Sequence, residues 1–136
     1  MIYELLSLSQ VLDKVQQTGT EVRYHHERCQ TDKVAGFYQF NSTVDRLVIC
    51  PSNQLNHSDL FDTIRHESVH VIQACKAGAI MPYDYWLENA THNAKQNVSK
   101  YPKDRQTQHY ELEAFTIAEV LSEKDIITLI DKYCFE

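Results

Sequence analysis

The amino-acid sequence predicts a single α+β domain over residues 1–136, in which a helix precedes a small, mainly antiparallel sheet and several helices follow it. Apolar residues recur at helical spacing near the N-terminus and throughout the second half, whereas short alternating stretches lie between them. The chain has 136 residues and is 43% hydrophobic, which suits one domain with a substantial core.

The first half of the sequence indicates one helix and three strands. The N-terminal segment has apolar residues at helical spacing, and Gly19 is expected to end that helix. The alternating or β-branched stretches 20–26, 35–40 and 46–50 are each typical of a strand, and Pro51 ends the third. The second and third strands are expected to form a hairpin.

The second half of the sequence indicates helices. The longest is expected to begin at Ser58, a suitable N-cap, and to stop at Gly78. The helices expected are, in chain order, 58–77, a short one within 88–100, 104–121 and 124–133.

Charge and hydropathy restrict the function classes. The net charge of −6, without a basic stripe, argues against direct nucleic-acid binding. No apolar run approaches the roughly 20 residues of a membrane span. The N-terminal Met1–Leu6 lacks the basic start and long apolar core of a signal peptide, so we expect a cytoplasmic location.

The four cysteines are widely spaced and form no Cys-x-x-Cys pair, which argues against a thiolate zinc site. In a reducing compartment we expect four free thiols, mostly buried. Cys29 and Cys50 could also meet on neighbouring strands.

One motif carries clear chemistry: residues 66–70 read His-Glu-Ser-Val-His. Residues four apart lie on one face of a helix, so His66 and His70 are able to bind one zinc ion at about 2.0–2.1 Å. Glu67, roughly 100° round the helix, is placed to take a proton from a metal-activated water. Manganese, cobalt or iron would suit the same ligands.

A catalytic zinc needs a third protein ligand, and the expected helix 104–121 offers three candidates. Glu111 shares a face with Ala114 and Ala118, whose small side chains would allow close approach to the histidine helix, so we favour Glu111. Glu113 and His109 are the alternatives.

Two further roles have several candidates each. Asp62 or Gln73 is placed to orient an imidazole. A donor for the oxyanion that forms during peptide hydrolysis is expected among a small group of tyrosines and histidines, namely Tyr83, Tyr85, His92, His109 and Tyr110.

His66-Glu67-Ser68-Val69-His70, followed by Glu111-Leu112-Glu113-Ala114, resembles the gluzincin pattern, and the short chain is similar to the compact minigluzincins of bacteria and phages. The resemblance implies a zincin-like fold with His66, His70 and Glu111 as zinc ligands and Glu67 as general base. It also implies that strand Arg46–Cys50 pairs with an extended substrate. Phe115 follows the alanine where many such families have Asp or Asn.

From these residues we expect a zinc-dependent peptidase that hydrolyses a peptide or protein substrate. The alternative is a non-catalytic zinc-binding or partner-sequestering protein on the same scaffold, because an intact motif does not by itself prove turnover.

Overall fold

The computed structural model describes residues 2–135, so Met1 and Glu136 lie outside the described residues. The fold is α+β, with a three-stranded mixed sheet among seven α-helices in the described range. The elements in chain order are α1 (Ile2–Gln17), β1 (Glu21–Arg23), α2 (Glu27–Thr31), β2 (Gly36–Phe40), β3 (Asp45–Ile49), the 3-10 helix η1 (Pro51–Asn53), α3 (His57–Lys76), α4 (Tyr83–Asn89), α5 (His92–Val98), α6 (Arg105–Val120) and α7 (Glu123–Cys134).

The sheet has the strand order β1-β3-β2. Strands β2 and β3 form the expected antiparallel hairpin, with Tyr38 opposite Leu47. Strand β1 pairs with β3 in parallel, so the sheet is less antiparallel than predicted. The segment between β1 and β2 contains α2, which carries the chain across the sheet and leaves β3 in the centre. The predicted strand 20–26 stops early because His26 accepts a hydrogen bond from the Arg28 amide and caps α2.

The side chains of β3 divide between two apolar clusters, as alternation along a strand requires. Leu47 and Ile49 face the main core, which also receives residues from α1, α3, α6 and α7. Val48 and Cys50 face a smaller cluster with Phe37 on the opposite side of the sheet. Helix α3 therefore lies on one face of the sheet and α2 on the other.

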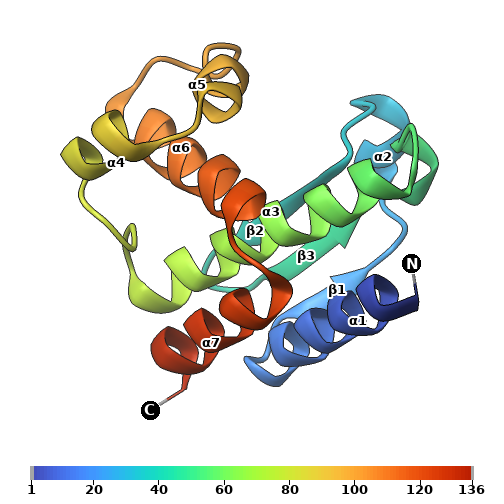
Figure 1. Cartoon of the computed structure of the whole chain (residues 1–136). Helices are drawn as coiled ribbons and strands as arrows, with labels where there is room; N and C mark the ends of the chain where they lie inside the picture. The colour runs from blue at the N-terminus through green and yellow to red at the C-terminus, as the bar shows by residue number, and fades with distance from the viewer. Residues whose placement is uncertain (1, 136) are drawn as a thin grey trace.

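Helix α3 crosses the middle of the molecule, with the sheet on one side and α6 and α7 on the other (Figure 1). Its N-cap is Asn56, whose side chain accepts from the Asp59 amide, and not the expected Ser58. The helix ends at Lys76. Its C-cap is Ala77, which takes the left-handed conformation, whereas Gly78 was the expected stop. The helix is thus displaced by only one residue from its predicted bounds.

The single helix predicted within 88–100 is replaced by two short helices, α4 and α5. The break falls at Ala90 and Thr91, and the Thr91 side chain accepts from the Ala94 amide to cap α5. The aromatic segment that precedes Leu87 is helical as well, because the Trp86 indole is drawn into the core. The sequence pattern did not indicate α2, η1 or α4.

The expectation of four free thiols is wrong. Cys29 is bonded to Cys50, and Cys75 is bonded to Cys134. The first disulfide joins α2 to the end of β3, and the second joins the last turn of α3 to the last turn of α7. The tertiary structure brings together residues separated by 21 and 59 positions, which sequence spacing could not indicate.

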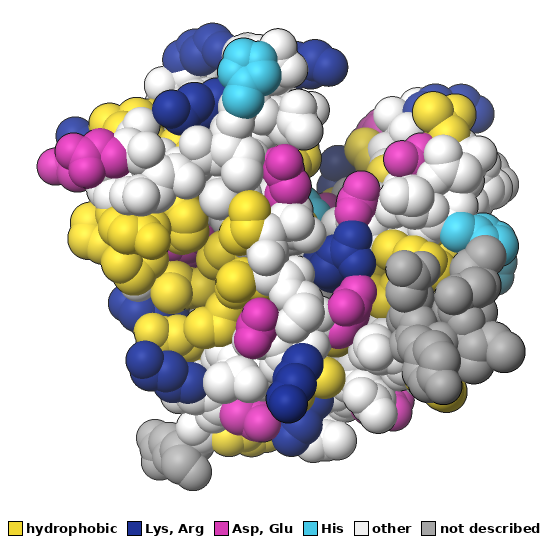
Figure 2. All heavy atoms as spheres, viewed as in Figure 1, with side chains coloured by type: hydrophobic (Ala, Val, Ile, Leu, Met, Phe, Trp, Pro, Cys, Tyr) yellow, Lys and Arg dark blue, Asp and Glu magenta, His cyan; other side chains and the backbone are white. Residues whose placement is uncertain are grey.

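No helix among residues 2–135 is both long and apolar enough to cross a bilayer. The surface is hollowed between the region of α5 and the region of α2, and hydrophobic side chains gather near α4 (Figure 2). The hollow lies over the middle of α3, where the predicted metal ligands are.

Candidate metal centre

The two motif histidines lie side by side in the middle of α3, against Glu111 of α6. Their Nε2 atoms are 3.3 Å apart, and the rings meet nearly edge to face. Both side chains are largely buried. The four-residue spacing therefore produces the convergence that the sequence predicted.

Glu111, on α6, completes this group. Its Oε1 lies 3.0 Å from His66 Nε2, and its Oε2 lies 2.9 Å from His70 Nε2. Helix α6 approaches α3 closely because Ala114 and Ala118, one and two turns further along, are buried small residues. Of the three candidates for the third ligand, Glu111 alone is brought against both histidines.

The donor set fits a zinc ion. Two nitrogen ligands at about 2.05 Å in tetrahedral geometry stand about 3.3 Å apart, which matches the separation of the two Nε2 atoms. The donor atoms of His66, Glu67 and His70 lie within 4.8 Å of one another, so Glu67 is close to any ion that the two histidines hold. Two imidazoles and one carboxylate constitute the ligand set of a catalytic zinc with an open position.

Burial, hydrogen bonds and charges shift the pKa values of His70 and Glu111 strongly. Burial by itself lowers the pKa of His70, but the hydrogen bond to Glu111 and the charges of Glu67 and Glu111 raise it to about 9. Burial raises the pKa of Glu111, but its hydrogen bonds to His66 and His70 and their positive charge lower it to about 2. Glu111 is therefore ionised, and its carboxylate offers the negative charge that a cation requires.

Glu67 points into the cleft beside His66 and is only 8% exposed. Its carboxylate borders the hollow on both sides of the histidines. Gly36 of β2 lies against its side chain, because a Cβ at that position would stand 3.5 Å from Glu67 Cγ. The edge strand of the sheet therefore fixes how far this carboxylate can move.

The orienting partner of His70 is Gln73, one of the two residues predicted for that role. Gln73 Oε1 lies 2.7 Å from His70 Nδ1. Asp62, the other candidate, is instead paired with Arg65. Nδ1 of His66 is buried and has no hydrogen-bond partner among residues 2–135.

Glu113 and His109, the alternative ligands, point away from the histidine pair. Glu113 is completely buried and accepts hydrogen bonds from Ile80, Met81, Trp86 and Gln73. His109 Nε2 lies 2.8 Å from the Met81 carbonyl oxygen. These two residues hold the segment after α3 against α6.

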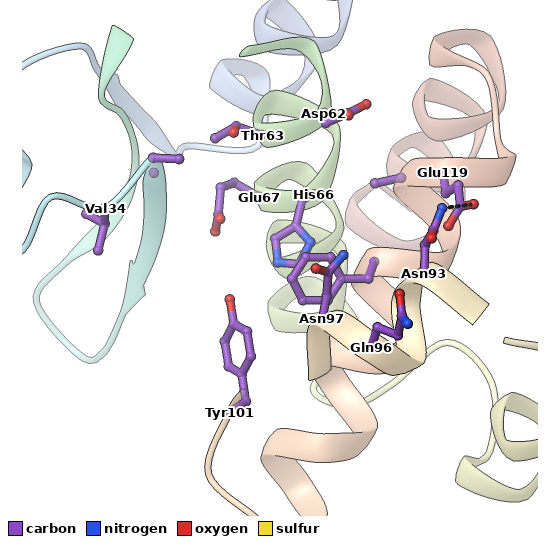
Figure 3. Close-up of a pocket in the computed structure, with 14 residues that line it drawn as sticks. Val34, Asp62, Thr63, His66, Glu67, Asn93, Gln96, Asn97, Tyr101 and Glu119 are labelled. Atoms are coloured by element: carbon purple, nitrogen blue, oxygen red, sulfur yellow. Dashed lines mark hydrogen bonds between the residues drawn. The ribbon is translucent and has the colours of Figure 1, made fainter. Parts of the chain in front are cut away.

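Tyr101, in the loop after α5, is a site residue that sequence analysis missed. Its hydroxyl points toward the Glu67 carboxylate across the cleft (Figure 3). Burial and the negative charges of Glu111 and Glu67 raise the pKa of this phenol, so it stays protonated and able to donate. No periodic pattern identifies a tyrosine in a polar loop, so only the fold reveals it.

Most of the predicted oxyanion donors lie elsewhere. Tyr83 packs on His109, and Tyr85 packs on Trp86. His92 is exposed on α5. Of the five, only Tyr110 lines a cavity together with the motif histidines.

Two cavities meet at the histidine pair. One, of about 550 Å³, is bordered by α5 and the start of β2, and the other, of about 730 Å³, by β2 and α6. His66, Glu67, Gly36 and Tyr101 border both. Together the cavities form a groove that runs across the candidate metal centre.

The predicted substrate strand, Arg46–Cys50, is wrong in position. Strand β3 is central, and both of its edges are occupied by β1 and β2. Strands β1 and β2 are the two edge strands, and residues of β2 border the groove.

The model of a protein family described as "Domain of unknown function (DUF8637)" matches residues 4–135 of this chain. No curated protein and no solved structure matches the chain. The geometry of the site is therefore the basis for assigning a function.

Proposed function

We propose that this chain, which belongs to the DUF8637 family, is a zinc-dependent peptidase. Glu67 is its general base. The observation that carries the proposal is that His66 Nε2 and His70 Nε2 lie 3.3 Å apart and that each lies within 3.0 Å of one oxygen of Glu111. A zincin-like fold is part of the same proposal, supported by the histidine helix beside an edge strand.

Zinc held by these three residues would act as a Lewis acid toward a peptide carbonyl and lower the pKa of water. Glu67 accepts the proton of the attacking water and afterwards donates it to the leaving amine. Tyr101 donates a hydrogen bond to the carbonyl oxygen as negative charge develops there. The low exposure of Glu67 limits competition from bulk water.

The groove supports an extended peptide as the substrate. Its two cavities lie on either side of Glu67, so residues on both sides of a scissile bond would find room. The free edge of β2 offers backbone groups for strand addition. Small substrates would not need a groove of this length.

The two disulfides favour an oxidising compartment over the expected cytoplasm. Disulfides persist outside the cytosol and are rare within it. We therefore propose that the protein acts on peptides or proteins in an oxidising environment.

The deciding experiment compares the wild type with Glu67→Gln after zinc loading. Zinc content should be equal in both, measured by elemental analysis, whereas cleavage of a mixed peptide library should disappear in the variant. Asp59→Asn is the matched control, because it removes one charge from the first turn of the same helix at a residue that lines neither cavity. Cleavage that survives Glu67→Gln would refute the proposed mechanism.

A wild-type protein that binds zinc and cleaves nothing in the library would favour the alternative, a non-catalytic protein that holds zinc or sequesters a partner. A protein that binds no zinc would refute the zinc peptidase and the zinc-holding form of the alternative.

A further inference from the structure

We propose that Glu113, which lies outside the ligand set, is a positioning residue that prepares His70 for zinc through the side-chain amide of Gln73. This inference rests on the zinc site of the proposed function. It assigns a role in metal affinity to a carboxylate whose evident role is to support the fold.

The surroundings of Glu113 consist of donors. Its Oε1 is 2.9 Å from Gln73 Nε2 and 2.8 Å from the Ile80 amide. Its Oε2 is 2.8 Å from the Met81 amide and 2.7 Å from the Trp86 indole nitrogen. Backbone amides and an indole N–H can only donate, so Glu113 must act as acceptor at both oxygens.

The acceptor role of Glu113 fixes the orientation of Gln73. The same Gln73 atom faces Glu113 and, at 3.1 Å, the Tyr110 carbonyl oxygen. Both partners only accept, so this atom must be the NH2 group. The amide oxygen of Gln73 is then the atom that faces His70.

The orientation of Gln73 in turn fixes the tautomer of His70. An amide oxygen only accepts, so the proton must lie on His70 Nδ1, 2.7 Å away. Without a metal, Nε2 donates its proton to Glu111, and a metal ion that displaces this proton meets the Nε2 lone pair between His66 and Glu111. A metal-binding imidazole needs this arrangement, and outer partners of this kind also hold the ring in place.

A neutral amide at position 113 would relax the constraint, because only the Tyr110 carbonyl oxygen, at 3.1 Å, would still have to accept from Gln73. The new amide presents one donor group and one acceptor group, so it could donate to a reversed Gln73. The NH2 of a reversed Gln73 would face His70 Nδ1 and favour the proton on Nε2, where it blocks the metal. We therefore expect Glu113→Gln to weaken zinc binding roughly 10–100-fold.

The test is a double substitution. Gln73→Glu combined with Glu113→Gln exchanges the two groups, so the new carboxylate at position 73 can only accept from His70 Nδ1. Zinc affinity, measured by competition with a chelating dye, should fall in Glu113→Gln and recover most of the loss in the double variant. Glu119→Gln is the matched control, because it removes a charge from the exposed side of the same helix.

Two results would overturn the inference: an unchanged affinity in Glu113→Gln, or a double variant that binds no better than the single one. The second result would mean that Glu113 only supports the fold, since both variants lose the carboxylate at position 113. If the wild type binds zinc in either case, the proposed function still stands. If the wild type binds none, the proposed function itself fails.

Loss of the buried charge also threatens folding, so thermal unfolding of each variant accompanies the affinity measurement. If Glu113→Gln does not fold, Gln73→Leu tests the step on which the role of Glu113 depends, the contact of Gln73 with His70, and it leaves the other three donors of Glu113 in place. Its zinc affinity should fall by a similar factor, and an unchanged affinity would overturn the inference.

Discussion

The ring of Phe115 lies 4.2 Å, centroid to centroid, from the imidazole of His66. His66 Nδ1 has no hydrogen-bond partner among the described residues, whereas His70 Nδ1 faces Gln73. Away from Glu111, the His66 ring is therefore held by packing and the His70 ring by a hydrogen bond. Phe115 occupies the position where the resemblance leads one to expect Asp or Asn.

Replacing Phe115 with Ala should weaken zinc binding, because the His66 ring loses the surface that orients it. The free energy of unfolding should also fall, by about 3 kcal/mol or less, since the ring is only partly buried. Zinc competition and urea denaturation measure the two effects. Phe40→Ala, which removes an exposed ring, is the control, and equal zinc affinity in the two variants would contradict the role of Phe115.

Tyr101→Phe should reduce kcat by about 10²–10³-fold while zinc affinity stays unchanged, as for the loss of one oxyanion donor. The substitution keeps the ring that packs on Phe115. Tyr85→Phe removes a hydroxyl outside the groove and should have no effect. A Tyr101→Phe variant with wild-type kcat would exclude the hydroxyl from the reaction.

Gly36→Ala should destabilise the protein by about 1–3 kcal/mol. The new Cβ would stand 2.8 Å from Thr63 Cγ2 and 2.8 Å from the Val48 carbonyl oxygen, so β2 must move away from α3. Because Gly36 also borders Glu67, cleavage should fall as well. Gly78→Ala meets nothing within 4 Å and is the matched control in urea denaturation. Equal midpoints for the two variants would show that β2 is not in close contact with α3.

Removing the Cys75–Cys134 bond should lower the free energy of unfolding by about 4 kcal/mol, and removing the Cys29–Cys50 bond should lower it by about 3 kcal/mol. The reason is the chain entropy that the unfolded state regains when loops with sequence separations of 59 and 21 are opened. Paired alanine substitutions and denaturant midpoints would measure each cost. Thiol titration of the unfolded, unreduced protein should find no free cysteine. Four reactive thiols would contradict both bonds.

Acid should destabilise helix α6 through its cap. Asp104 accepts hydrogen bonds from the Thr107 amide, which lower the pKa of Asp104 below its ordinary value of 3.8. A carboxyl with a lowered folded pKa stabilises the protein above its unfolded pKa, and this contribution is lost as the pH falls through the folded pKa. The urea concentration at the unfolding midpoint should therefore decrease as the pH falls below about 4.

Asp104→Asn keeps a capping side chain that does not titrate. The variant should lose less of its urea midpoint between pH 5 and pH 2 than the wild type, because both proteins share every other carboxyl group. Parallel curves for the two proteins would rule out this contribution of Asp104.

The sequence by itself determined the site residues that depend on local periodicity. The helical spacing of His66 and His70 forces their side chains onto one face, and the phase of Ala114 and Ala118 places Glu111 toward the neighbouring helix. The hairpin of β2 and β3 and the bounds of α3 and α6 also followed from local patterns, to within one or two residues.

Only the tertiary structure decided which distant groups meet. Spacing could not reveal the parallel pairing of β1 with β3, the two disulfides, the Tyr101 hydroxyl over the groove, or the contact of Glu113 with Gln73. Each joins segments far apart in sequence, and such contacts depend on how whole elements pack and not on the periodicity within one element. The local pattern thus supplied the candidate ligands, and the packing of α6, β2 and the loop after α5 supplied their surroundings.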